Sequence, residues 1–182
     1  CFIDDKKKAL SHQLVLFVIG AIDIYLEKYS YESVFSFLNS GFANLSDRQI
    51  NILENYVLAV NLNKNAWYDD TKWNYTLKAY AKNNYLIEKY NNELKQARDV
   101  FIGKIKPFHD TIKGRKKASV MVKALYSYLE DIGFFNKISD MIKNFEKTGD
   151  NESAKQYLSL AESIINTFDE IIPLLTNISQ LK

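Results

Sequence analysis

Apolar residues recur at the spacing of an α-helix along most of this sequence, and few helix-breaking residues interrupt them. The 182 residues include only two prolines and six glycines, which is few for a protein built from strands and tight turns. Apolar side chains at every third or fourth position form a stripe along one face of a helix. The sequence therefore predicts an all-α fold, an irregular multi-helix bundle that buries a hydrophobic core.

Caps and helix breakers predict where the individual helices begin and end. The first helix, over residues 10–28, is apolar around much of its circumference, so we expect it to be the central buried helix. Ser46 and Gln49 have the spacing of a capping box, in which each side chain accepts a hydrogen bond from the other residue's backbone amide. A helix should therefore begin after Ser46. A long helix over residues 85–105 is predicted to end or kink at Pro107.

The remaining helices are predicted from apolar stripes followed by glycine or proline. They cover residues 31–39 before Gly41, residues 118–132 before Gly133, residues 136–147 before Gly149, and residues 151–175, whose last turn Pro173 should bend. The stripe of the last helix is predicted to be Ala154, Leu158, Ala161, Ile165, Phe168 and Ile172.

The sequence lacks the common motifs of nucleotide and metal chemistry. It contains no G-x-x-x-x-G-K-[ST] motif and no H-E-x-x-H motif. His12 and His109 are distant in sequence and have no partner motif, and adjacent acids such as Asp69 and Asp70 are typical of solvated loops. We therefore expect no catalytic residue, no metal site and no cofactor in this stretch of sequence.

Cys1 is the single cysteine, which excludes intrachain disulfides and thiolate-based zinc sites. Lysines before an apolar run are also typical of a signal peptide, and an initial cysteine is typical of a lipoprotein. The apolar run Leu14–Ile22 has nine residues, whereas a helix needs about 20 to span a bilayer. A segment of a longer cytoplasmic protein is the simpler interpretation. A stand-alone helical lipoprotein or interaction module anchored through Cys1 is the alternative.

Positive charge is concentrated in one stretch, although the formal net charge of the chain is only +2. Seven Lys and Arg residues and one acid, Asp110, occur between residues 104 and 123. Phosphate binding by such a stretch is independent of base sequence and weakens steeply with salt. A simple solvated loop has the same pattern. The candidate DNA-binding cations are Lys104, Lys106, Lys113, Arg115, Lys116 and Lys117.

Both tryptophans, Trp67 and Trp73, lie in a polar stretch that is predicted to be a loop. Their rings can fold back over the helices as a lid, burying on the order of 200 Å² each. Alternatively, they can stack on an unpaired base or on a partner protein, because aromatic stacking tolerates any base. Both tryptophans are therefore candidate DNA-binding residues as well as candidate core residues.

Short motifs in the first 73 residues resemble those of one bacterial protein family. They are Phe2-Ile3-Asp4, then His12 and Leu14, then Tyr31, Glu32, Val34, Phe35, Leu38 and Gly41, and finally Leu53-Glu54-Asn55-Tyr56 followed by Trp67. In these motifs the chain resembles the AddB family, one of the two subunits of the bacterial AddAB-type (RexAB) ATP-dependent helicase/nuclease. Gln13, Asn39, Ser40, Asn61 and Leu62 depart from the family pattern.

The resemblance implies an organisation and a role. Residues 1–8 would be the end of a strand and loop of the helicase core, and residues 9–182 would be a helical domain resembling the 2B-type insertion of superfamily 1 helicases. The segment would be a non-catalytic scaffold with a DNA-contacting surface, in double-strand break repair and recombination. The longer protein would form a heterodimer with the AddA-type helicase/nuclease protein and act on a duplex end or single strand. It would use ATP, Mg²⁺ and an iron–sulfur cluster bound elsewhere, without membrane attachment.

Overall fold

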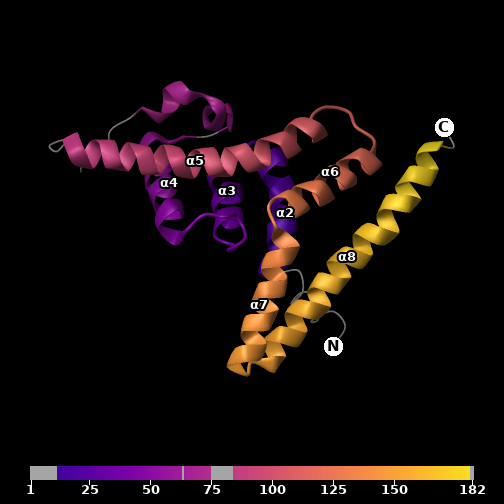
Figure 1. Cartoon of the computed structure of the whole chain (residues 1–182). Coiled ribbons are helices and arrows are strands. Elements are labelled where there is room, and N and C mark those ends of the chain that lie inside the picture. The colour runs from indigo at the N-terminus through magenta and orange to yellow at the C-terminus, as the bar shows by residue number, and fades with distance from the viewer. Residues whose placement is uncertain (1–11, 63, 75–83, 181–182) are drawn as a thin grey trace. The chain divides into compact units, whose positions relative to one another are not determined.

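The computed structural model describes residues 12–62, 64–74 and 84–180, and within these ranges it contains helices and no strand. The predicted all-α class is confirmed, and the likeness to a helicase insertion stays a prediction. The helices are α2 (Gln13–Leu26), α3 (Tyr31–Leu38), α4 (Asp47–Val60), η1 (Lys64–Tyr68), η2 (Asp70–Trp73), α5 (Asn84–Ile112), α6 (Ala118–Asp131), α7 (Phe134–Thr148) and α8 (Asn151–Gln180), with η1 and η2 being 3₁₀-helices (Figure 1).

The chain forms two compact units, an N-terminal unit within Leu10–Ile105 and a C-terminal unit within Lys106–Lys182. Helix α5 begins in the first unit and ends in the second. The prediction of a single helical domain over residues 9–182 stays a prediction. The predicted strand end and loop over residues 1–8 lie outside the described residues, as does Cys1.

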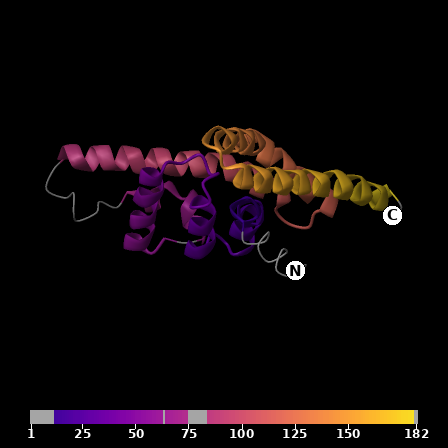
Figure 2. The ribbon, with the colours of Figure 1, turned by 90° about the horizontal axis from the view of Figure 1, so that it is seen from below.

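Aromatic side chains fill the core of the N-terminal unit, in which α2, α3 and α4 lie on one side of α5 (Figure 2). Phe17 of α2 stacks on Phe37 of α3 with ring centroids 4.4 Å apart, and Phe37 in turn lies 6.2 Å from Phe101 of α5. All three side chains are at most 2% exposed. These large apolar side chains therefore join helices that are distant in sequence.

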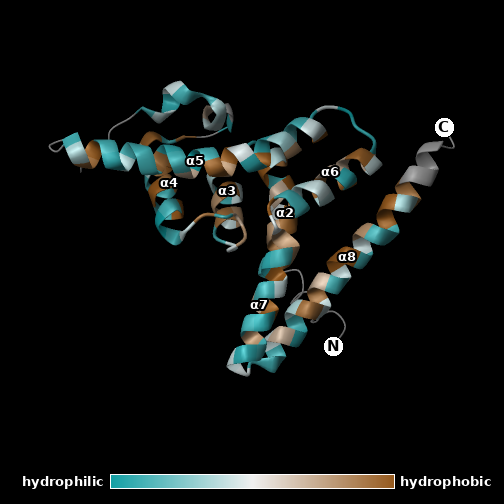
Figure 3. Ribbon diagram, in the orientation of Figure 1, coloured by the Kyte–Doolittle hydropathy of each residue, from teal (hydrophilic) through white to brown (hydrophobic). Residues whose placement is uncertain are grey.

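Helix α2 is less buried than the sequence predicts. It is apolar along most of its length (Figure 3), yet only Leu14, Phe17, Ala21 and Ile24 are buried. Leu16, Ile19 and Leu26 are 42%, 41% and 64% exposed. The prediction of a central buried helix was wrong, because α2 packs mainly against α3 and buries a single face.

The predicted start of α4 is confirmed in detail. The Ser46 side chain accepts a hydrogen bond from the Gln49 backbone amide, and the Gln49 side chain accepts one from the Ser46 backbone amide at 3.0 Å. The capping box satisfies amides that would otherwise lack partners at the helix start. Because this cap fixes where α4 begins, it also fixes the register of the helix that leads into the tryptophan stretch.

Proline does not end either long helix. Helix α5 continues past Pro107 to Ile112, and α8 continues past Pro173 to Gln180. The predicted end near residue 105 was therefore wrong, and the alternative, a kink at Pro107, stays a prediction. A proline removes one backbone donor and crowds the carbonyl four residues earlier, which here belongs to Gly103. Burial of Phe108, which stacks on Tyr128 of α6 with ring centroids 5.3 Å apart, favours continuation of the helix.

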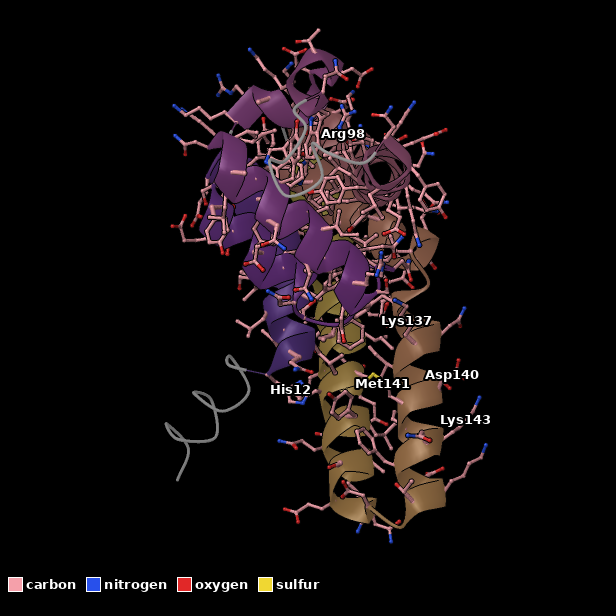
Figure 4. The ribbon with its side chains drawn as sticks, turned by 90° about the vertical axis from the view of Figure 1, so that its left-hand side faces the viewer. His12, Arg98, Lys137, Asp140, Met141 and Lys143 are labelled. Carbon is pink, nitrogen blue, oxygen red and sulfur yellow. The ribbon has the colours of Figure 1, made fainter. Side chains whose placement is uncertain are left out.

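The C-terminal unit contains an antiparallel pair, α7 and α8, that turns at Gly149 (Figure 1). Gly149 has φ +78°, a left-handed conformation that glycine adopts without steric cost, and Gly133 before α7 has φ +72°. Both glycines are therefore confirmed as helix ends. Figure 4 shows the side chain of Met141 directed toward α8, whereas Asp140 and Lys143, an ion pair at 3.6 Å, point away from it.

The apolar stripe of α8 is only partly buried. Ala154, Ala161 and Phe168 are buried as predicted, and Phe168 meets Tyr126 of α6 edge to face at 5.3 Å. Leu158 and Ile165 are 47% and 37% exposed, so these two members of the predicted stripe lie outside the core. The buried face of α8 is therefore narrower than its apolar stripe, because the facing helices cover only part of it.

We predict that replacing Ser46 by alanine lowers the free energy of unfolding by about 1 kcal/mol, because the cap of α4 is lost. Urea unfolding monitored by circular dichroism measures the effect. Ser36→Ala is the matched control, because Ser36 is exposed within α3 and makes no side-chain hydrogen bond with a described residue. Equal midpoints for Ser46→Ala and the wild-type chain would contradict a stabilising role of this cap.

Candidate nucleic-acid interface

The tryptophan segment, residues 64–74, is not an open loop but a pair of 3₁₀-helices, η1 and η2. Trp67 on η1 has no exposed surface. Its ring meets Phe101 of α5 edge to face with centroids 5.3 Å apart, and it also approaches Phe35 of α3 at 6.4 Å. Trp67 is therefore a core residue of the N-terminal unit.

Trp73 closes the same segment from outside. Its ring stacks on Tyr56 of α4, with centroids 5.1 Å apart and an interplanar angle of 9°. Its indole N–H donates to the Ala66 carbonyl at 3.0 Å, while the Tyr56 hydroxyl donates to the Lys72 carbonyl at 2.7 Å. These contacts tie η2 to both η1 and α4, so the segment is a folded lid.

Arg98 of α5 holds the lid from beneath, and it is a residue that the sequence analysis missed (Figure 4). Its side chain is only 8% exposed. Its Nε donates to the Trp67 carbonyl at 3.0 Å, and its Nη1 donates to the exposed Asp70 carboxylate at 2.6 Å. The guanidinium also lies 5.1 Å from the Trp73 ring centroid, a cation–π distance. One cation thus contacts η1, η2 and the outer tryptophan.

A signal for Arg98 does exist in the sequence. Leu94, Ala97 and Phe101 form the buried stripe of α5, and Arg98 falls on that stripe, four residues after Leu94. A charged residue at a core position needs partners because burial of an unpaired charge is costly. An arginine on an apolar stripe therefore indicates buried carbonyl or carboxylate partners.

Hydrogen bonds also organise the exposed turn between η1 and η2. Asp69 accepts from the Thr71 backbone amide at 3.0 Å and from the Thr71 hydroxyl at 2.7 Å. These two bonds hold the pKa of the Asp69 carboxyl below its usual value. Asp69 therefore acts as the cap of η2, which accounts for one of the two adjacent acids without any metal role.

The lid limits how the tryptophans can meet DNA. The ring of Trp67 is enclosed, so stacking on a base would require the segment to open. Trp73 is half-exposed, but one face of its ring already lies on Tyr56. The predicted DNA contacts of both residues stay predictions, and the lid interpretation accounts for every contact they make here.

The predicted basic cluster lies in the C-terminal unit, mainly in the loop between α5 and α6, which we call the basic loop (residues 113–117; Figure 3). Lys113, Arg115, Lys116 and Lys117 are all exposed, and none forms an ion pair with a described residue. The structure therefore brings four solvated cations together within five residues.

Backbone geometry adds to this positive site. Gly114 has φ +79°, which lets the chain turn sharply within the loop. Lys117 occupies the N-cap position of α6 without a side-chain cap, and the first turn of α6 contains no acid. Free amides and the partial positive charge at a helix start both favour anions. The loop and the start of α6 thus have the same electrostatic preference.

The two other predicted cations differ from those of the loop. Lys106 forms an ion pair with Asp110 one turn later, so its charge is partly neutralised. Lys104 is exposed on α5 and belongs to the N-terminal unit, together with both tryptophans. The basic loop belongs to the C-terminal unit. The predicted site residues are thus divided between the two units, and the four loop cations are the group that one unit holds together.

The described residues provide no metal centre. No group of three or more His, Cys, Asp and Glu side chains lies close enough to hold a metal ion in the described part of the chain. His12 instead caps α2, because its Nδ1 accepts from the Leu14 amide at 3.3 Å, and His109 is buried in α5. The iron–sulfur cluster and Mg²⁺ that the resemblance implies for the longer protein stay predictions.

Among the residues that the structure describes, no helix combines the length and apolar content needed to cross a membrane.

We predict that Arg98→Met lowers the free energy of unfolding by roughly 1–3 kcal/mol, because it leaves the buried Trp67 carbonyl without its donor. It should also shift the tryptophan emission to longer wavelength, since the lid loses the group that joins η1 to η2. Urea unfolding followed by tryptophan fluorescence measures both effects. Lys95→Met is the control, because Lys95 is exposed on the same helix. A variant as stable as Lys95→Met, with unchanged emission, would refute the clamp.

Comparisons with known proteins agree with the motifs. No protein-family model matches the chain. The chain is 30% identical to the B subunit of the ATP-dependent helicase/deoxyribonuclease of Ruminiclostridium cellulolyticum, over 97% of this chain and 16% of the relative. The proteins of the same name from Acetivibrio thermocellus and Clostridium kluyveri are also 30% identical, over 94% and 96% of this chain and 15% of each relative.

The chain therefore spans about one-sixth of the length of these relatives. The similarity covers nearly all of its helices, including the tryptophan lid and the basic loop, and the predicted resemblance is confirmed. The chain belongs to the family of B subunits of ATP-dependent helicase/deoxyribonucleases, in which it corresponds to one helical segment.

Proposed function

We propose that this segment is a non-catalytic helical scaffold of a helicase/deoxyribonuclease that contacts the DNA backbone through the basic loop. The observation that carries the proposal is a set of four exposed cations, Lys113, Arg115, Lys116 and Lys117. None of them forms an ion pair with a described residue, and they lie beside a helix start that has no side-chain cap. The relatives of the chain are named for action on DNA.

The chemistry of the basic loop suits phosphates better than bases. Lysine and arginine neutralise phosphates without reading base sequence, and the amides at the start of α6 donate to anionic oxygens. A motor or nuclease that moves along DNA needs contacts that do not depend on base sequence. The basic loop supplies such contacts, and the acidic residues of α8 lie outside it.

The hydrogen bonds of the polar side chains agree with a scaffold role. Arg98, Tyr56 and Asp69 all hold the lid, and each has a structural partner. The titratable residues described above therefore serve packing or solvation. ATP hydrolysis and phosphodiester cleavage would reside in other parts of the longer protein, together with ATP, Mg²⁺ and the iron–sulfur cluster.

The names of the relatives indicate the complex in which the segment would work. A protein named as one subunit of an enzyme works with at least one other, and we propose the AddA-type helicase/nuclease protein as the partner in a heterodimer. The complex would act in the cytoplasm on duplex ends or single strands during double-strand break repair and recombination. The basic loop would guide one of these forms of DNA across the surface of the complex.

We predict that replacing all four loop cations by glutamine weakens DNA binding by the chain and flattens its salt dependence. Fluorescence anisotropy with a labelled duplex, titrated between about 50 mM and 200 mM salt, measures both quantities. Each phosphate contact contributes about −0.9 to the slope of log K against log salt on duplex and about −0.7 on a single strand. Loss of four contacts should therefore reduce the slope by about 3.6 on duplex.

A matched control separates this site from general charge. The control variant replaces four exposed lysines outside the basic loop by glutamine, which changes the net charge equally: Lys64, Lys95, Lys147 and Lys155. The proposal expects the control to keep most of the affinity and slope. Equal losses in both variants would indicate non-specific attraction, and absence of binding by the wild-type chain at low salt would contradict the proposed contact.

A further inference from the structure

A groove of about 450 Å³ runs between α4 and the first part of α5, entirely within the N-terminal unit. Helix α4 lines it with Arg48, Asn51, Ile52 and Asn55, which lie on one face at helical spacing. Helix α5 lines the opposite wall with Leu86, Lys89, Tyr90 and Glu93, again on one face. Neither the basic loop nor the tryptophan lid contributes to it.

Two contacts across the groove set its width. Glu93 accepts from Nε and Nη2 of Arg48 at 3.0 Å and 2.7 Å, and the Tyr90 hydroxyl donates to the Ile52 carbonyl at 3.4 Å. Tyr90 is 7% exposed, so its ring anchors α5 in the core. These contacts therefore link the two walls of the groove.

The groove combines an apolar floor with an amide-rich wall. Ile52 and Leu86 contribute apolar surface, and Leu86 is 41% exposed although it is a large hydrophobic residue. Asn51 and Asn55 are exposed on adjacent turns of α4, and their side chains make no hydrogen bond with another described residue. Residues four apart on a helix lie about 5–6 Å apart, so both amides can reach one ligand.

An asparagine amide offers both a donor and an acceptor. A peptide bond presents the same two kinds of group, so each asparagine can pair with the backbone of an extended peptide. A phosphate presents acceptors only and would use half of this capacity. The amide pair Asn51 and Asn55 therefore matches a polypeptide main chain better than a sugar–phosphate chain.

The charges of the groove suit one carboxylate rather than a polyanion. Arg48 is oriented by Glu93 through two of its nitrogens, which leaves Nη1 free to donate to a ligand. Lys89, on the opposite wall, forms no ion pair with a described residue. With Glu93 included, the lining has a formal excess of one positive charge. A nucleic-acid strand would place repeated negative charges beside Glu93.

We propose that the α4–α5 groove is a protein-interaction site that binds a short extended segment of a partner protein, with a carboxylate next to a large apolar side chain. The carboxylate lies between Arg48 and Lys89, Asn51 and Asn55 pair with the partner's backbone, and the apolar side chain covers Ile52 and Leu86. The site is separate from the basic loop, so it does not depend on the proposed DNA contact.

The test is a selection of random linear peptides displayed on phage against the immobilised 182-residue chain. Enriched sequences are synthesised with a fluorescent label, and their affinities are measured by anisotropy. We expect an Asp or Glu beside a Leu, Ile, Met, Phe or Tyr in the enriched peptides. The two groove variants, Lys89→Gln and the double variant Asn51→Ala/Asn55→Ala, should each weaken binding at least about tenfold.

Controls address folding and specificity. The replaced side chains are exposed, so circular dichroism should show unchanged helix content, and Lys95→Gln on the outer surface of α5 should bind normally. In the wild-type chain, bound peptide should shift the side-chain amide signals of Asn51 and Asn55 in nitrogen-15 NMR spectra. This second readout needs no variant.

Three results would overturn the proposal. One is enrichment of no peptide with a carboxylate. Another is binding that both groove variants retain. The third concerns a labelled oligothymidylate: its binding would be lost in the groove variants but kept in the basic-loop variant. The groove would then be a nucleic-acid site. Loss of DNA binding in the basic-loop variant alone leaves the groove proposal unaffected.

Discussion

The N-terminal unit depends on one buried cation, Arg98. Burial of a guanidinium is costly unless its donors are satisfied. Arg98 meets this requirement with the Trp67 carbonyl and the Asp70 carboxylate, and its position against the Trp73 ring adds a cation–π contact. Because both hydrogen-bond acceptors belong to η1 and η2, these two bonds form only when the lid is closed. The need of Arg98 for hydrogen-bond acceptors thus couples the folding of the lid to the folding of α5.

The tetrapeptide Leu53-Glu54-Asn55-Tyr56, which carries most of the family resemblance, has a structural role beside this lid. Leu53 is fully buried, and Tyr56 supports Trp73 through its ring and binds the Lys72 carbonyl through its hydroxyl. Glu54 accepts a hydrogen bond of 2.5 Å from Tyr31 of α3, which raises the pKa of the tyrosine hydroxyl. Asn55 differs, because it faces the α4–α5 groove. Three of the four residues therefore build the unit, and one is available for binding.

Local sequence signals predicted local structure well and tertiary placement less well. The capping box at Ser46 and the glycine ends at Gly133 and Gly149 depend on neighbouring residues alone, so they were predictable. Continuation of α5 past Pro107 depends on Phe108 packing against Tyr128, a contact that periodicity does not contain. The four loop cations were recognisable because they are adjacent in sequence. Burial of Trp67 was left open, since it depends on Arg98 thirty-one positions away.

The two proposed surfaces differ in how their chemistry is encoded. The basic loop is a continuous stretch, so its charge is set by composition and tolerates small changes in backbone geometry. The groove joins residues from α4 and α5 that are distant in sequence, so it depends on the register of the two helices, which the Arg48–Glu93 and Tyr90–Ile52 contacts link. Loss of that register removes peptide recognition but leaves the loop charges in place. If both proposals hold, the segment holds DNA by charge and a protein partner by shape, and each contact can change independently of the other.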